Sequence, residues 1–198
     1  MSIALEIEAK SWLDEDAYNR LLSRFSLQKP YIQTNFYLDS PSRLLKSKGA
    51  SLRVRQKEDG LELTLKLDQD EGRIEMNAAL SEDQFDAIKD GRFPESVPMR
   101  ALEELGISAE ELKILASLST ERIDIEIDDG LISIDKNAYG NTVDYEIECE
   151  SSSMAKAEAL LRSFLSQHGI PYRPNAISKQ KRALQEAGLG ASPKAESR

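Results

Sequence analysis

Short stretches in which charged and apolar residues alternate one by one recur along most of this chain. The first is Leu5-Glu6-Ile7-Glu8-Ala9-Lys10, and similar alternation returns at residues 52–57, 73–79 and 142–150. Successive side chains of a β-strand point to opposite faces, so each stretch predicts a strand with one charged and one apolar face. The chain is therefore expected to form a sheet whose apolar face must be covered.

The spacing of turn residues and of apolar residues extends this interpretation to the whole chain. Asp59-Gly60 and Asp129-Gly130 are typical of tight hairpin turns between neighbouring strands. Apolar residues at helical spacing predict helices that would cover the sheet. Strands are expected at residues 5–10, 33–39, 52–57, 61–67, 73–79, 120–128, 131–136 and 142–150, and helices at residues 14–25, 81–89, 154–167 and 178–187. Two shorter helices are expected, one around residues 99–105 and one capped at residue 108, and a long turn at residues 41–49.

The charged strand faces allow two arrangements. A single charged face is usually a solvated outer surface over a core. Several such strands, together with amphipathic helices that need an apolar surface to cover, favour a sheet closed on itself with its charges inside. About eight strands leave an interior that holds one small ligand. Periodicity alone leaves both arrangements open.

Composition removes several classes of function. The 198 residues carry 26 Lys and Arg against 35 Asp and Glu, a net charge of -9, which argues against nucleic acid or an anionic membrane as partner. The only cysteine is Cys149 and the only histidine is His168, so disulfides and His/Cys zinc sites are excluded, and a metal must be a hard cation on carboxylates. No apolar run exceeds three residues, so no membrane span is expected, and we expect a cytoplasmic protein.

The charged stretches also resemble, in order, the motifs of the CYTH family, the triphosphate tunnel metalloenzymes. Glu6-Ile7-Glu8-Ala9-Lys10 resembles the ExExK signature of that family, and Leu52-Arg53-Val54-Arg55 resembles its LRxR strand. Further similarities are Thr64-Leu65-Lys66, Glu75, Thr120-Glu121-Arg122, Ile134-Asp135 with Tyr139-Gly140, Tyr145-Glu146-Ile147-Glu148 and Ser178-Lys179. The resemblance spans residues 3 to about 184 and points to the bacterial single-domain members. It implies an α+β fold: a closed antiparallel β-barrel of about eight strands with peripheral helices. We expect one domain over residues 1–187 and a disordered tail over residues 188–198.

The resemblance also implies roles for individual residues. Substrate phosphates would be bound by Lys10, Arg53, Arg55, Lys66, Arg122 and Lys179. A Mg²⁺ or Mn²⁺ ion would be held by Glu6, Glu8, Glu146 and Glu148. Catalysis would involve Glu6, Glu8, Lys10, Glu75 and Asp135. Lys136 follows Asp135 and on strict alternation points outward, so it receives no role.

The activity implied is metal-dependent hydrolysis of small triphosphate compounds, with inorganic tripolyphosphate as the leading substrate. Thiamine triphosphate hydrolysis and cyclisation of ATP are alternatives within the family, and near the motif strands no clear aromatic cradle for an organic group is found beyond Phe36, Tyr37 and Tyr139. A non-catalytic sensor of polyphosphate or nucleotide is an alternative of another class. The sequence leaves open whether Lys181 and Arg182 contact substrate and whether the chain forms a homodimer.

Overall fold

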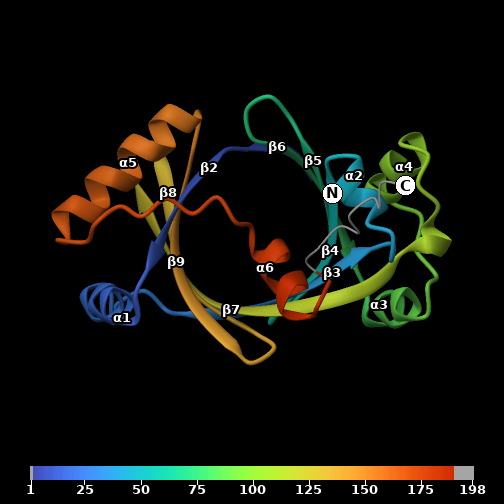
Figure 1. The fold of residues 1–198 in the computed structure, drawn as a ribbon, viewed down its shortest axis with the longest axis horizontal. Coiled ribbons are helices and arrows are strands. Elements are labelled where there is room, and N and C mark those ends of the chain that lie inside the picture. The colour runs from blue at the N-terminus through green and yellow to red at the C-terminus, as the bar shows by residue number, and fades with distance from the viewer. Residues whose placement is uncertain (1, 190–198) are drawn as a thin grey trace, which may run out of the picture.

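The computed structural model describes residues 2–189, and its central feature is one nine-stranded antiparallel sheet (Figure 1). The strands are β1 (Ser2–Glu6), β2 (Glu8–Leu13), β3 (Tyr31–Asp39), β4 (Ala50–Lys57), β5 (Gly60–Asp68), β6 (Arg73–Leu80), β7 (Lys113–Ile127), β8 (Gly130–Tyr139) and β9 (Thr142–Ser151). The helices are α1 (Glu15–Arg24), α2 (Leu44–Ser47), α3 (Glu82–Lys89), α4 (Val97–Glu104), α5 (Met154–Gln167) and α6 (Lys179–Glu186), and a short 3₁₀ turn, η1, covers Ala109–Glu111.

The sheet curls on itself because its two outermost strands are halves of one run. The strand order is β1-β6-β5-β4-β3-β7-β8-β9-β2, and only Ile7 separates β1 from β2 in the chain. At this break the Ser151 N–H donates to the Ile7 carbonyl at 3.1 Å. The predicted antiparallel barrel of about eight strands is confirmed, with β1 and β2 forming the strand that the sequence shows as one.

The barrel is charged inside and apolar outside, so the hydrophobic core lies between the sheet and the helices. On the outer face of β5, Leu63 and Leu65 are fully buried in a cluster with Phe85 of α3 and Leu102 of α4. A second cluster joins the outer faces of β2, β7, β8 and β9 to α1 and α5. Each such leucine stabilises the fold by roughly 1.5–3 kcal/mol. The inward charges therefore need not supply the main stabilisation of the fold.

In the view of Figure 1 the strands form a ring, and helix α6 lies within it. Helices α1, α3, α4 and α5 lie outside the ring. The Ser178 side chain caps the amino end of α6 by accepting the Lys181 N–H at 3.2 Å, as the sequence predicts. At its other end Glu186 packs against the β8–β9 turn, where a Cβ on Gly140 would come within 2.6 Å of the Glu186 Cγ. The turn therefore requires glycine, which also tolerates its φ of +54°.

Two segments differ from the sequence-based expectation. The long turn expected at residues 41–49 contains the single-turn helix α2, which is entered through Arg43 with a left-handed φ of +63°. Strand β7 begins at Lys113 rather than near residue 120, because its first half pairs with β3 across a register shift next to Tyr37. The start of β7 depends on pairing with a distant strand, and α2 on a local network around Asp39; local periodicity reveals neither.

The carboxyl-terminal tail expected over residues 188–198 lies outside the described residues from 190 onward. Gly188 and Leu189 close α6, with the Leu189 N–H donating to the Leu184 carbonyl at 2.8 Å. Among residues 2–189, no helix is long and apolar enough to cross a membrane.

Candidate active site

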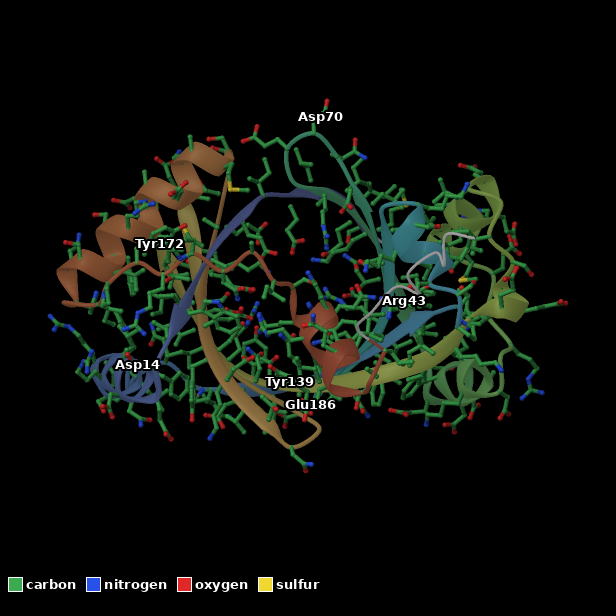
Figure 2. All side chains as sticks on the ribbon, viewed as in Figure 1. Asp14, Arg43, Asp70, Tyr139, Tyr172 and Glu186 are labelled. Atoms are coloured by element: carbon green, nitrogen blue, oxygen red, sulfur yellow. The ribbon has the colours of Figure 1, made fainter. Side chains whose placement is uncertain are left out.

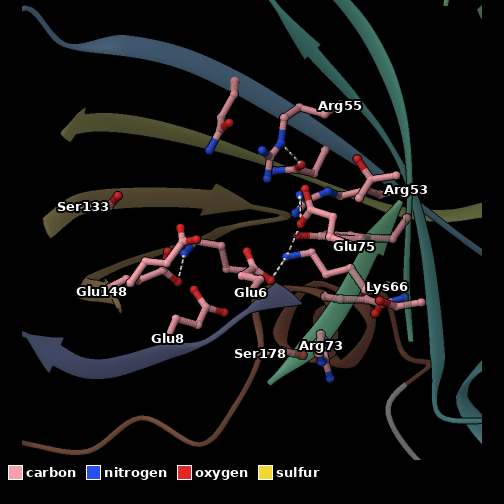
Figure 3. Close-up of a pocket in the computed structure, with 18 of the residues that line it drawn as sticks. Glu6, Glu8, Arg53, Arg55, Lys66, Arg73, Glu75, Ser133, Glu148 and Ser178 are labelled. Carbon is pink, nitrogen blue, oxygen red and sulfur yellow. Dashed lines mark hydrogen bonds and ion pairs between the residues drawn. The ribbon is translucent and has the colours of Figure 1, made fainter. Parts of the chain in front are cut away.

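A polar cavity of about 240 Å³ runs through the barrel interior. Most of the predicted site residues line it, namely Glu6, Glu8, Lys10, Arg53, Arg55, Lys66, Glu75, Arg122, Glu148 and Lys179. The two that do not are Asp135 and Glu146, which lie behind this lining and are fully buried. Figure 3 shows Glu6, Glu8 and Glu148 gathered on one side of the cavity and Arg53 and Arg55 on the other.

The side formed by β3 and β4 carries positive charge that the protein leaves incompletely neutralised, and we call Arg53, Arg55 and their neighbour Asn35 the unpaired wall. The Arg55 Nε donates to the Asn35 Oδ1 at 3.1 Å, and no carboxylate among the described residues forms an ion pair with Arg55. Burial, together with the charges of Arg53 and Arg122, lowers the pKa of Arg55 to about 10. Such a site favours a bound anion.

Arg53 has a carboxylate partner, which Arg55 lacks among the described residues, but the contact is long and one of its donors is unused. Its guanidinium lies 3.7 Å from the Glu75 carboxylate, and its Nε is buried without a hydrogen-bond partner. An unpaired buried donor is costly unless a ligand accepts from it. Arg53 therefore favours an anionic ligand, as Arg55 does.

Lys66 links the unpaired wall to the carboxylates of the first strand. Its ammonium contacts Glu6 and lies 2.8 Å from Glu75. Burial would raise the pKa of Glu75, but the charges of Lys66 and Arg53 outweigh it and lower that pKa to about 2. Glu75 is therefore ionised at neutral pH and holds both cations in place.

On the opposite side, formed by β7, β8, β9 and α6, both cations are paired with carboxylates, and we call Arg122, Asp135, Glu146, Glu148 and Lys179 the paired wall. The Arg122 guanidinium makes two bonds of 2.6 Å to the Asp135 carboxylate and a third of 2.6 Å to Glu148. The Lys179 ammonium lies 2.7 Å from both Asp135 and Glu148 and also contacts Glu146. Oxygens of Asp135, Glu146 and Glu148 come within 4.8 Å of one another, and Lys179 already serves this acidic group as its cation.

Arg182 answers one question that the sequence leaves open. It is buried behind the cavity, where its guanidinium donates to Glu146 at 2.9 Å and stacks 4.6 Å from the Trp12 ring. Glu146 also accepts from the Asn175 amide at 2.6 Å. Burial would raise the pKa of Glu146, but Lys179 and the Arg182 hydrogen bond lower it to about 2. Arg182 thus neutralises a buried carboxylate and does not line the cavity.

Glu150 is a cavity residue that the sequence-based assignment missed. It lies directly opposite Glu8 in the β2–β9 ladder, at the cavity rim, and partial burial followed by the charges of Glu6 and Glu8 raises its pKa. Facing carboxylates repel each other unless a cation lies between them. The alternation of Glu146, Glu148 and Glu150 on one strand face is the signal that could have identified Glu150.

These carboxylates fit a hard divalent cation. Glu6, Glu8, Glu148 and Glu150 all line the cavity and supply oxygen ligands, the kind that Mg²⁺ and Mn²⁺ prefer. Partial burial and then the charges of Glu6 and Glu8 raise the pKa of Glu150, so a cation at this rim would stabilise its ionised form. The neighbouring Lys10 offsets part of it, lying 2.7 Å from Glu8 and 2.8 Å from Glu148.

Comparison with known proteins agrees with this geometry. The family model of the CYTH domain matches residues 4–183. YjbK of Bacillus subtilis (strain 168), named as a candidate triphosphatase, is 34% identical over 175 residues, which cover 87% of this chain and 91% of that protein.

Two solved structures share the fold at useful sequence identity. A candidate adenylate cyclase from Bacillus halodurans has a TM-score of 0.84 at 30% identity, covering 92% of this chain and 98% of its own. HpAC1 from Hippeastrum, a candidate adenylyl cyclase described as having a dominant triphosphatase activity, has a TM-score of 0.76 at 25% identity, covering 93% of this chain and 96% of its own.

Proposed function

This chain belongs to the CYTH domain family, and on that premise we propose that it is a divalent-metal-dependent triphosphatase acting on inorganic tripolyphosphate. The observation that carries the proposal is the unpaired wall facing a cluster of carboxylates across one cavity. An anion binder alone has no use for those carboxylates, and a metal site alone has no use for the unpaired arginines. A phosphate chain with a bound cation satisfies both.

The cations of the cavity would bind the phosphate chain. Arg53 and Arg55 present guanidinium forks, which match phosphate oxygens in pairs, and Lys10 and Lys66 act as point charges. Arg122 and Lys179 reach the same space from the paired wall. Because all six line one cavity, they can contact successive phosphates of one substrate molecule.

The metal would be Mg²⁺ or Mn²⁺, held by Glu6, Glu8 and Glu148 as expected from the sequence. We assign the fourth carboxylate to Glu150 in place of Glu146, because Glu146 is held by Arg182 and does not line the cavity. When bound, the ion supplies charge neutralisation and polarises phosphoryl oxygens.

The remaining residues assigned to catalysis either line the cavity themselves or position a residue that does. Lys10 lies between Glu8 and Glu148, where it contacts substrate and limits repulsion between the two carboxylates. Glu75 lines the cavity as an ionised acceptor that can orient the attacking water. Asp135 is fully buried and acts as a positioning residue for Arg122 and Lys179. Phosphoryl transfer needs mainly this kind of positioning.

The organic end of a nucleotide or thiamine substrate finds little aromatic surface. Of the three aromatic candidates, only Tyr37 lines the cavity, whereas Phe36 packs 5.0 Å from Phe85 in the outer core and Tyr139 bonds to Asp144. Cyclisation of ATP is the second candidate function, supported by the similarity to the candidate cyclases. The shortage of stacking surface favours tripolyphosphate over both organic substrates.

The experiment is a substrate and metal comparison on the purified protein. Tripolyphosphate, ATP and thiamine triphosphate are each incubated with Mg²⁺, with Mn²⁺ or with EDTA, and released phosphate and cyclic AMP are measured. We expect phosphate from tripolyphosphate to exceed that from the organic substrates, and only with metal. Tripolyphosphate binding without any release would instead identify a sensor, and cyclic AMP as main product would identify a cyclase.

Two broader expectations also stay proposals. The lone buried Cys149 suits the reducing cytoplasm, where we place the protein. A homodimer is the second, and sedimentation or light scattering on the purified chain would test it.

A further inference from the structure

A second cavity, of about 370 Å³, adjoins the substrate cavity and is absent from the roles assigned so far. We call it the annex. Ser51, Arg73, Ser178 and Gln180 line both cavities, so the two spaces share a wall. Figure 3 shows Arg73 and Ser178 next to each other at this junction. A chain-like ligand in the barrel that continues past them enters the annex.

The annex is rich in positive charge. Arg43, Lys46, Arg73 and Lys181 line it, against the single carboxylate of Asp68. Asp68 is already paired with Arg73, whose Nε lies 2.9 Å away. In the part of the chain that the structure describes, neither Lys46 nor Lys181 takes part in an ion pair. The annex therefore carries excess positive charge next to a site built for phosphates.

Arg43 is held in the annex by a structured loop. Its Nε lies 3.1 Å from the buried Asp39 carboxylate, which also accepts the N–H groups of Ser40 and Leu45. The Arg43 backbone adopts a left-handed conformation that non-glycine residues rarely occupy, with φ at +63°. Its Nη1 is buried and has no hydrogen-bond partner. The loop thus presents a cation with an unused donor; Figure 2 labels Arg43 beside α2 and β4.

The remaining walls of the annex indicate what kind of ligand it takes. They include Ala50, Ala176, Leu184 and Leu189, and no aromatic ring lines the annex within the described residues. A nucleobase or thiazole ring would find no stacking partner, whereas further phosphates would meet four cations.

We propose that the annex is a subsite for the phosphates of linear polyphosphates longer than tripolyphosphate, entering from the barrel past Arg73. The substrate class then extends from tripolyphosphate to longer linear chains. This inference rests on the proposed function in one respect, namely that the barrel cavity holds a phosphate chain. It does not depend on turnover.

The test is a calorimetric binding measurement in EDTA, which keeps it separate from hydrolysis. Tripolyphosphate, linear hexaphosphate and ATP are titrated into the intact protein and into the double variant Lys46→Gln/Lys181→Gln. Both lysines are exposed and unpaired, so the variant is expected to fold. The matched control is Lys48→Gln/Lys113→Gln, which removes two exposed lysines that line neither cavity.

We expect hexaphosphate to bind the intact protein more tightly than tripolyphosphate, and the annex variant to weaken hexaphosphate about fivefold while changing tripolyphosphate by less than about twofold. The control variant should leave both affinities unchanged. Equal weakening of both phosphates, or none, overturns the proposal. Weakening of ATP alone overturns it as well and assigns the annex to the organic end of a substrate. Failure of the proposed function is a different result, namely no metal-dependent phosphate release by the intact protein.

Discussion

The two walls of the barrel treat their arginines in opposite ways. On the paired wall, burial alone would lower the pKa of Arg122, but the charges of Asp135 and Glu148 raise it well above its usual value. On the unpaired wall, burial and neighbouring arginines lower the pKa of Arg55 to about 10. A buried cation surrounded by carboxylates stabilises the protein without a ligand. A buried cation without carboxylates favours the binding of an anion. The two walls therefore separate residues that maintain the barrel from residues that we propose bind substrate.

The largest expected effect is on stability, and it comes from behind the paired wall. Arg182→Ala should leave the fully buried Glu146 without its guanidinium partner and lower the free energy of unfolding by about 3–5 kcal/mol. Urea unfolding measures it, with Lys181→Ala as the matched control, since Lys181 is exposed on the same helix. A loss of similar size in the control would mean that α6, and not the ion pair, sets the stability.

Acid should destabilise the empty protein through the same carboxylate. The pKa of Glu146 is near 4.5 when unfolded and about 2 when folded, so its contribution is present above pH 4.5 and is lost as the pH falls through 2. The effect is on the order of a few kcal/mol. Urea unfolding at several pH values between 5 and 2, in EDTA, should show a steeper decline for the intact protein than for Glu146→Gln. Parallel declines would place the acid sensitivity elsewhere.

The unpaired wall should show the opposite behaviour, with weaker binding and no loss of stability. Arg55→Ala removes a cation that has no carboxylate partner, so it should raise KM for tripolyphosphate and leave urea unfolding unchanged. The rise in KM should correspond to a loss of about 1.5–3 kcal/mol of binding free energy. Glu8→Gln, at a proposed metal ligand, should instead reduce kcat and the response to metal. Indistinguishable kinetics for the two variants would contradict the division between substrate and metal ligands.

Lys179 belongs to the paired wall yet lines the cavity, so it should show a smaller and mixed effect. Lys179→Ala should lower kcat/KM at least tenfold, about 1.4 kcal/mol, and should also reduce stability, because three carboxylates lose their shared cation. Steady-state kinetics and urea unfolding on the same preparation test both effects. Full activity in a folded variant would make α6 a structural cap only.

The placement of most site residues could be predicted from the sequence because alternation with period two determines which face a side chain occupies. It placed Glu6, Glu8 and Lys10 together, and Arg53 with Arg55, as the structure confirms. The fold followed for the same reason, since polar or charged inner faces and apolar outer faces repeat in most strands. The closing of the sheet was suggested by the helices that needed an apolar surface to cover.

The sequence could not show how the surroundings of residues on one face of a strand differ from one position to the next. Glu146, Glu148 and Glu150 share the inner face of β9, and alternation treats them alike. Their environments differ because, of these three residues, only Glu146 contacts Arg182 and Asn175, which come from distant segments, while Glu8 faces Glu150. The annex was missed for a similar reason, since it depends on the left-handed backbone at Arg43 and on where α6 ends.

The break at Ile7 has a consequence for how the protein is made. Strand β2 leaves the ribosome well before its partner β9, which ends at Ser151, so the ring stays open until β9 has also been synthesised. During that time β2 is an unpaired edge, the kind of segment that aggregates with other chains. Its charged residues Glu8 and Lys10 counter this, because charged side chains on a strand edge stay hydrated and resist burial against another chain. The residues that serve the finished site thus also protect the nascent chain.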